Sequence, residues 1–163
     1  MKTETAILAG GCFWGVQFYF DQVPGVVKTE VGYIGGHTQN PTYEQVCGHG
    51  TGHAEATKIT FDPKKVSFDT ILKHFFRIHD PTQLNRQGPD VGDQYRSAIF
   101  YTTDKQKEQA QKMLDLLSNS GKYQKPIVTA LQNAGTFWPA EEYHQKYTEK
   151  TGLGACHVDY APV

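Results

Sequence analysis

The cysteines carry the most distinctive chemistry in this chain of 163 residues, which has three of them, at positions 12, 47 and 156. Cys12 stands in the run GGCFWG, residues 10–15, between an apolar stretch and a segment with helical spacing. Because two glycines permit a tight turn, we expect Cys12 in the first turn of a helix. Amide N–H groups and the helix dipole at such a position lower the pKa of a thiol and favour the nucleophilic thiolate. The alternative is a small, buried apolar side chain, the commoner role of a lone cysteine.

Two large apolar side chains, Phe13 and Trp14, follow the cysteine directly. They lie too close to the turn for both to be buried with the helix face. We therefore expect them to form the walls of a small apolar pocket at the sulfur.

A carboxyl group and two phenols are the other candidates for chemistry. Glu55 begins a run of small and apolar residues, and partial burial there would raise its pKa so that it can donate a proton. Tyr43 and Tyr95 stand in two irregular stretches, 35–53 and 80–96, a placement that favours contact with a substrate. The alternatives are a solvated glutamate at a strand edge and tyrosines that only pack.

A zinc site is a competing hypothesis for the group Cys47, His49 and His53, since thiolate and imidazole are preferred zinc ligands. The chain has no Cys-x-x-Cys, and the spacing matches none of the common zinc patterns, so we expect no metal.

Two further classes of thiol chemistry stay open on the residues alone. A Cys-His hydrolase would pair Cys12 with one of seven histidines, although no feature selects which one. Redox chemistry requires a second thiol on a flexible segment, and Cys156 follows the glycine-spaced residues 152–154. A redox enzyme and a thiol-based redox sensor would both use this pair.

Composition narrows the class of protein. The formal net charge is −1 and there is no basic run, so neither nucleic acid nor an anionic membrane surface is an expected partner. No stretch has the pattern of a signal peptide or the length of a membrane span. An odd number of cysteines suits a reducing compartment. We expect a cytoplasmic monomer with one catalytic domain, residues 1–163, in which 149–163 is a mobile tail that carries Cys156.

Periodicity predicts the elements that must position these groups. Val27, Val31 and Tyr33 are expected on one face of a strand, and Met113, Leu114, Leu116 and Leu117 on the inner face of a helix. The predicted strands are 5–9, 26–33, 55–61, 98–102 and 127–131, and the predicted helices are 13–22, 68–79, 104–120 and 140–148. The resulting order β-α-β-β-α-β-α-β-α favours an α+β two-layer sandwich with helices packed on a mixed sheet.

Six ordered motifs resemble the A-type family of peptide methionine sulfoxide reductases over nearly the whole chain. They are GGCFWG, GHTQNPTYEQV at 36–46, TGHAEATKITFDP at 51–63, DVGDQYRSAIFY at 90–101, PAEEYHQKY at 139–147 and CHVD at 156–159. The resemblance implies a two-layer α/β sandwich with a ferredoxin-like core and a long irregular C-terminal tail. It also implies reduction of methionine S-sulfoxide, free or in proteins, without a cofactor.

The same resemblance implies a role for each matching residue. Cys12 attacks the sulfoxide sulfur, and Glu55 protonates the departing oxygen. The remaining roles are hydrogen bonds to that oxygen from Tyr43 and Tyr95, organisation of the site by Asp90, and contacts with the S-methyl group from Phe13 and Trp14.

Turnover in the family implies a second thiol and an external reductant. Cys156 would condense with the sulfenic acid formed on Cys12, giving a disulfide that thioredoxin reopens by exchange. Cys47 is then a spare thiol and the alternative resolving residue.

Overall fold

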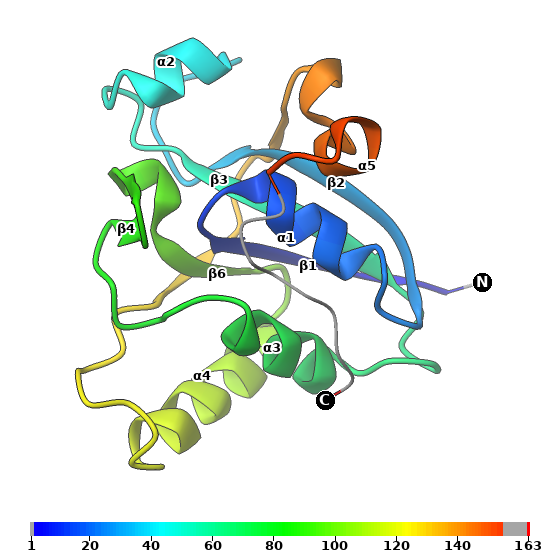
Figure 1. Cartoon of the computed structure of the whole chain (residues 1–163). Helices are drawn as coiled ribbons and strands as arrows, with labels where there is room; N and C mark the ends of the chain where they lie inside the picture. Colours follow the sequence, from blue (N-terminus) through cyan, green and yellow to red (C-terminus); the bar gives the residue numbers. More distant parts are fainter. Residues whose placement is uncertain (1, 155–162) are drawn as a thin grey trace.

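The structure is a computed structural model that describes residues 2–154 and Val163 (Figure 1). Its centre is a six-stranded sheet with the order β7-β6-β1-β3-β2-β8. Neighbouring strands are antiparallel except β6 and β7, which are parallel, so the sheet is mixed as expected. The strands are β1 (Glu4–Gly10), β2 (Val26–Ile34), β3 (Ala54–Phe61), β6 (Ser97–Tyr101), β7 (Ala130–Asn133) and β8 (Trp138–Pro139).

Three helices cover one face of the sheet. α1 lies across the sheet in Figure 1, and α3 and α4 pack side by side below it. Shorter elements surround the upper end of the sheet. The helices are α1 (Phe13–Phe20), α2 (Tyr43–Cys47), α3 (Phe68–Arg77), α4 (Asp104–Ser118) and α5 (Tyr147–Thr151), with 3-10 turns η1 (Asp93–Tyr95) and η2 (Glu142–His144) and a small hairpin β4 (Arg86–Gln87) and β5 (Asp90–Val91).

The central strands are buried on both faces. Ala6, Leu8 and Ile59 point toward the three helices and join their apolar side chains in one cluster. Ile7 and Ala9 point to the opposite face, which residues 130–137 cover. The four strands β6-β1-β3-β2 with α1 and α3 form the predicted ferredoxin-like core, so the fold class is confirmed.

Two predicted apolar faces contain an error. Val27 is 53% exposed because the pairing of β2 with β3 shifts register between Val26 and Lys28, which turns this residue out of the buried face. Leu116 is 67% exposed because the buried stripe of α4 follows Ala110 and Leu114, and Leu116 lies on the far side of the helix.

Several predicted boundaries differ from the structure. α1 ends at Phe20 and not at residue 22, and the strand expected at 127–131 lies at Ala130–Asn133, where it pairs with β6. The helix expected at 140–148 is instead η2 followed by α5, and Lys146 between them has φ +59°. α5 also takes in the first three residues of the segment expected to be an irregular tail.

Among the residues that the structure describes, no helix is both long and apolar enough to cross a membrane.

Candidate active site

Cys12 is the N-cap residue of α1 and is partly exposed. The turn before it has little room for side chains. Gly11 has φ +97°, a conformation that favours glycine. A Cβ on Gly10 would lie 2.8 Å from Cε1 of Phe75 and 3.1 Å from Cγ of His79. Close packing therefore fixes the turn that presents Cys12 at the positive end of an eight-residue helix, as the sequence predicts.

Glu55 lies in the second position of β3 and is only 1% exposed. Its register partner on β2 is Tyr33, so the two side chains share the face of the sheet that α1 covers. Oε1 of Glu55 accepts a hydrogen bond of 3.2 Å from the backbone N–H of Phe13. The solvated-glutamate alternative is thus wrong. The carboxyl group is buried against the residue that follows Cys12.

Two tyrosines from different elements face the Glu55 carboxyl group. Tyr43 is the first residue of α2, whose start is fixed by a capping box between Thr42 and Gln45. Tyr95 ends η1. Burial, and next the negative charge that Glu55 carries when it is ionised, raise the pKa of both phenols, so both hydroxyls stay protonated at neutral pH. Each can therefore act as a hydrogen-bond donor in this region.

Asp90 belongs to the small hairpin that precedes η1, the turn that carries Tyr95. It lies in β5 opposite Gln87 and is partly exposed. Its charge, like that of Cys12, contributes to the raised pKa of Tyr95. The structure therefore brings Cys12, Glu55 and Asp90 within electrostatic reach of one phenol.

The two aromatic residues after Cys12 have different environments. Phe13 is 1% exposed, and its ring packs against Tyr33 and His144 with centroid distances of 5.8 and 5.3 Å. Trp14 is partly exposed and stacks on Tyr147 with centroids 3.9 Å apart. Its indole N–H donates to Nδ1 of His144 at 2.9 Å. Of these two residues, Trp14 offers an exposed aromatic surface beside Cys12, and Phe13 is buried.

The sequence reasoning gave no role to Glu141 or His144, which the structure places at this site. Oε1 of Glu141 accepts from the Tyr33 hydroxyl at 2.9 Å, and Oε2 accepts from the backbone N–H of Tyr43 at 3.0 Å. These hydrogen bonds outweigh the effect of burial and lower the pKa of Glu141. The sequence held one signal for these residues, because several acidic and aromatic side chains lie close together in residues 139–147. This stretch is one of the family motifs, but neither residue received a role from it.

Cys47 ends α2 on the same side of the molecule. Burial and the charge of Glu55 raise the pKa of its thiol, and hydrogen bonds with Tyr43 and Gln94 only partly oppose this. A thiol with a raised pKa is a weaker nucleophile at neutral pH. Cys156, its competitor as resolving residue, lies outside the described residues. Gly154, two residues before Cys156 in the sequence, lies against Trp14, since a Cβ there would lie 2.9 Å from Cε3 of the ring.

The histidines near Cys47 do not fit a zinc site. Both ring nitrogens of His53 are engaged, Nδ1 with the N–H of Gly36 at 3.0 Å and Nε2 with the carbonyl of Thr38 at 2.8 Å. Within residues 2–154 the structure contains no group of three or more His, Cys, Asp and Glu side chains that could hold a metal ion.

Other buried histidines also have structural partners. His74 lies 2.6 Å from the hydroxyl of Tyr19, and His79 bonds to the carbonyl of Phe75 and to Ser97. The Nδ1 atom of His144 accepts a hydrogen bond from the indole N–H of Trp14.

Comparisons with known proteins agree with this geometry. Residues 4–163 match the family described as peptide methionine sulfoxide reductase. A relative from Methanothermobacter thermautotrophicus, peptide methionine sulfoxide reductase MsrA, is 54% identical over 157 residues, which cover 96% of this chain and 93% of the relative. The crystal structure of reduced Mxr1 from Saccharomyces cerevisiae superposes with a TM-score of 0.88 at 35% identity, covering 99% of this chain and 93% of Mxr1. Mxr1 in complex with Trx2 shares the fold, with a TM-score of 0.61 at 24% identity over 90% of this chain and 85% of Mxr1.

Proposed function

Because this chain belongs to the peptide methionine sulfoxide reductase family, we propose that its Cys12 is the nucleophile that attacks the sulfur of methionine sulfoxide. The enzyme reduces the sulfoxide to methionine. The observation that carries the assignment is the Glu55 carboxyl group, which is 1% exposed and bonded to the N–H of Phe13, the residue after the cysteine.

The first step transfers the sulfoxide oxygen. The Cys12 thiolate attacks the sulfoxide sulfur while Glu55 gives a proton to the oxygen, which is a poor leaving group until it is protonated. Tyr43 and Tyr95 donate hydrogen bonds to that oxygen as charge develops on it. The attack forms a bond between the two sulfur atoms. The protonated oxygen then moves from the methionine sulfur to the Cys12 sulfur, and the sulfur–sulfur bond breaks with two electrons left on the methionine sulfur. Cys12 becomes a sulfenic acid, so the methionine sulfur gains two electrons and the cysteine sulfur loses two.

The substrate sulfur must be held against the nucleophile. Trp14 supplies the partly exposed aromatic surface that receives the S-methyl group, and Phe13 packs on His144, on which Trp14 also stacks. Asp90 holds the loop that carries Tyr95. Preference for the S epimer follows from the family resemblance.

Regeneration requires a second thiol. Cys156 condenses with the sulfenic acid, water leaves, and a Cys12–Cys156 disulfide forms. A thioredoxin dithiol then reduces this disulfide by exchange. Two observations support the scheme: Gly154 lies against Trp14, and the yeast relative Mxr1 forms a complex with Trx2. Cys47, whose pKa is raised, is the alternative resolving residue.

The remaining assignments concern the domain organisation, the oligomeric state and the cellular compartment. The chain acts as a single catalytic domain, 1–163, and residues 149–163 carry the resolving cysteine. It works as a monomer in the cytoplasm, where a reducing compartment suits an odd number of cysteines.

A stoichiometric burst tests the proposal. Reduced protein is mixed with each epimer of a methionine sulfoxide peptide without a recycling reductant, and methionine and lost thiols are counted. We expect about one methionine and two lost thiols per enzyme from the S epimer alone. Cys12→Ser should give no methionine, and Cys156→Ser should give one methionine but stall with thioredoxin. A stall in Cys47→Ser alone would exchange the roles of the two thiols. No methionine from either epimer would contradict the proposal.

A further inference from the structure

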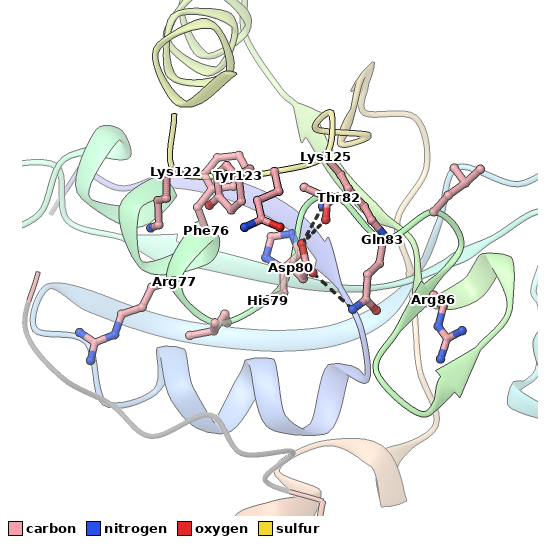
Figure 2. Close-up of a pocket in the computed structure, with 13 residues that line it drawn as sticks. Phe76, Arg77, His79, Asp80, Thr82, Gln83, Arg86, Lys122, Tyr123 and Lys125 are labelled. Carbon is pink, nitrogen blue, oxygen red and sulfur yellow. Dashed lines mark hydrogen bonds between the residues drawn. The ribbon is translucent and has the colours of Figure 1, made fainter. Parts of the chain in front are cut away.

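A cavity of about 880 Å³ lies outside the residues assigned to the reaction (Figure 2). Its walls come from the end of α3, from the loop that leads to β4 and from the segment after α4. Figure 2 shows Lys122 and Tyr123 on one side and Arg86 on the other, with Asp80 between them. We call this space the basic cavity and define it by His79, Asp80, Gln83, Arg86, Lys122 and Lys125.

Positive charge dominates the basic cavity, although the whole chain has a formal net charge of −1. Arg77, Arg86, Lys122 and Lys125 line it, and Asp80 is its acid. Three donors already satisfy the carboxylate of Asp80, namely N and Oγ1 of Thr82 at 2.9 and 2.6 Å and Nε2 of Gln83 at 3.3 Å. Burial tends to raise the pKa of Asp80, but these hydrogen bonds outweigh it and lower the pKa, so the carboxylate stays ionised.

The lysines of the cavity have no acidic partner in the described part of the chain. The ion pairs found there are Lys146 with Asp21 and His49 with Asp93. Lys122 lies over the ring of Tyr123, with Nζ 5.5 Å from the centroid, and both lysines are exposed. Two cations beside a cavity thus remain available to an anion.

The lining of the cavity also includes a tyrosine and apolar side chains. The hydroxyl of Tyr123 is buried and has no hydrogen-bond partner among residues 2–154. Leu84 is 68% exposed at the rim, and Phe76 lies at the floor. Cations, a phenol and apolar surface together suit a peptide that carries a carboxylate better than a small inorganic anion.

Single side chains connect the region of the basic cavity with the turn that precedes Cys12. His79, which lines it, lies against Gly10, and Gln87 lies against Gly11. Gln87 is joined to Asp80 by two hydrogen bonds, of 2.9 Å from the N–H of Asp80 and 2.6 Å to its carbonyl. The side of the basic cavity that His79 lines is therefore close to the turn before Cys12.

We propose that the basic cavity binds an acidic side chain of a polypeptide substrate whose oxidised methionine lies at Cys12. The proposal rests on the proposed function, because it concerns which substrates reach Cys12. It makes Lys122 and Lys125 determinants of substrate preference. Neither takes part in the chemistry.

Paired peptides test this. Each pair is identical except for Glu or Gln at one position, moved from two to five residues on either side of the sulfoxide. At the best position we expect the Glu peptide to have a kcat/KM roughly two- to ten-fold higher, through KM, the range that two partly solvated ion pairs give. The preference should fall in 0.5 M NaCl, since salt screens exposed charges.

Variants locate the effect. Lys122→Gln/Lys125→Gln should bring the Glu/Gln ratio close to one, and Tyr123→Phe should lower it to a lesser extent. The matched control is Lys105→Gln/Lys112→Gln, which removes the same charge from exposed positions on α4 and should keep the ratio.

Three results would overturn the proposal: no Glu preference at any position, an equal loss of the ratio in the control, or a rise in KM for thioredoxin in Lys122→Gln/Lys125→Gln with an unchanged peptide ratio. The last would make the cavity a docking site for the reductant. Reduction of N-acetyl-methionine sulfoxide by the unmodified enzyme separates these failures from a failure of the proposed function, which would leave this small substrate unreduced.

Discussion

Glu55 and Glu141 approach the same phenol, Tyr33, from two different regions of the molecule. Glu55 belongs to a central strand of the sheet and is opposite Tyr33 in the register of β2 and β3. Glu141 belongs to the irregular segment after the edge strand β8 and accepts a hydrogen bond from the hydroxyl of Tyr33. The charges of both raise the pKa of Tyr33.

The surroundings of the two carboxyl groups suit opposite tasks. Glu141 receives a backbone N–H and a phenol, one on each oxygen, and its pKa is lowered, so it stays ionised and holds two neighbours in place. Glu55 is deeply buried beside Cys12 and two further phenols. Burial disfavours the charged form of a carboxyl group and so favours the protonated form, which a proton donor must have. The comparison shows that the surroundings of a glutamate side chain decide its task. Hydrogen-bond donors on both oxygens suit it to hold neighbouring residues in place, and burial suits it to donate a proton.

The largest expected effect comes from Glu55→Gln, which keeps shape but removes the acidic proton. We expect the single-turnover rate of methionine formation to fall by about 10² or more, since general acid catalysis contributes 10²–10⁴-fold. Rapid-quench measurement of methionine in one turnover checks this. A rate within a few-fold of the unmodified enzyme would leave Glu55 with only a packing role.

A smaller effect is expected from Glu141→Gln. The amide places a donor where the N–H of Tyr43 or the hydroxyl of Tyr33 needs an acceptor. α2 then begins less rigidly, and the Tyr43 phenol is less well oriented. We expect kcat to fall by about ten-fold and the free energy of unfolding by about 1–2 kcal/mol. Chemical denaturation and steady-state assays measure the two. A loss as large as that of Glu55→Gln would show that the two carboxyl groups do not differ in task.

The sequence predicted one of these regions much better than the other. The alternation of Thr57, Ile59 and Phe61 places Glu55 at the start of a strand, and Ser67 caps α3 as expected, because these signals are local. Strand and helix periods therefore recovered the two-layer sandwich and the elements around Cys12, whereas the ferredoxin-like core came from the family resemblance.

The sequence predicted the wrong secondary structure around Glu141, and the reason is physical. Residues 140–148 were expected to form one helix and instead form η2 followed by the start of α5. Tertiary contacts break that helix: the N–H of Lys146 donates to Oε1 of Gln17 at 2.7 Å, and its Nζ pairs with Asp21 at 2.6 Å, which holds Lys146 at φ +59°. No local pattern encodes contacts with residues more than a hundred positions away.

The pH dependence of stability sharpens the comparison further. Because the folded pKa of Glu141 lies below its ordinary value of 4.5, its stabilisation is complete above about pH 5 and is lost as the pH falls through the folded pKa. The difference in unfolding free energy between the unmodified protein and Glu141→Gln should therefore be constant from pH 5 to 8 and shrink below pH 4.5. Asp80, whose pKa is also lowered, contributes equally to both proteins and cancels. Urea titrations at several pH values measure the difference, and a constant gap down to pH 3 would contradict the role assigned to Glu141.

Tyr33→Phe should have the smallest effect, since it removes one hydrogen bond and leaves the ring packed on Phe13. We expect a loss of roughly 1 kcal/mol in unfolding free energy and a change in kcat of no more than a few-fold. The sign of its pH dependence is opposite to that of Glu141. Burial and two negative neighbours raise the folded pKa of Tyr33 above its ordinary value of 10, so its contribution is complete below pH 10 and declines above it, as the unfolded chain loses the phenolic proton. Urea titrations should thus show the gap between Tyr33→Phe and the unmodified protein narrowing at high pH. A gap that widened there would mean that the phenol ionises more easily in the folded protein, and Tyr33 would not lie between two carboxylates.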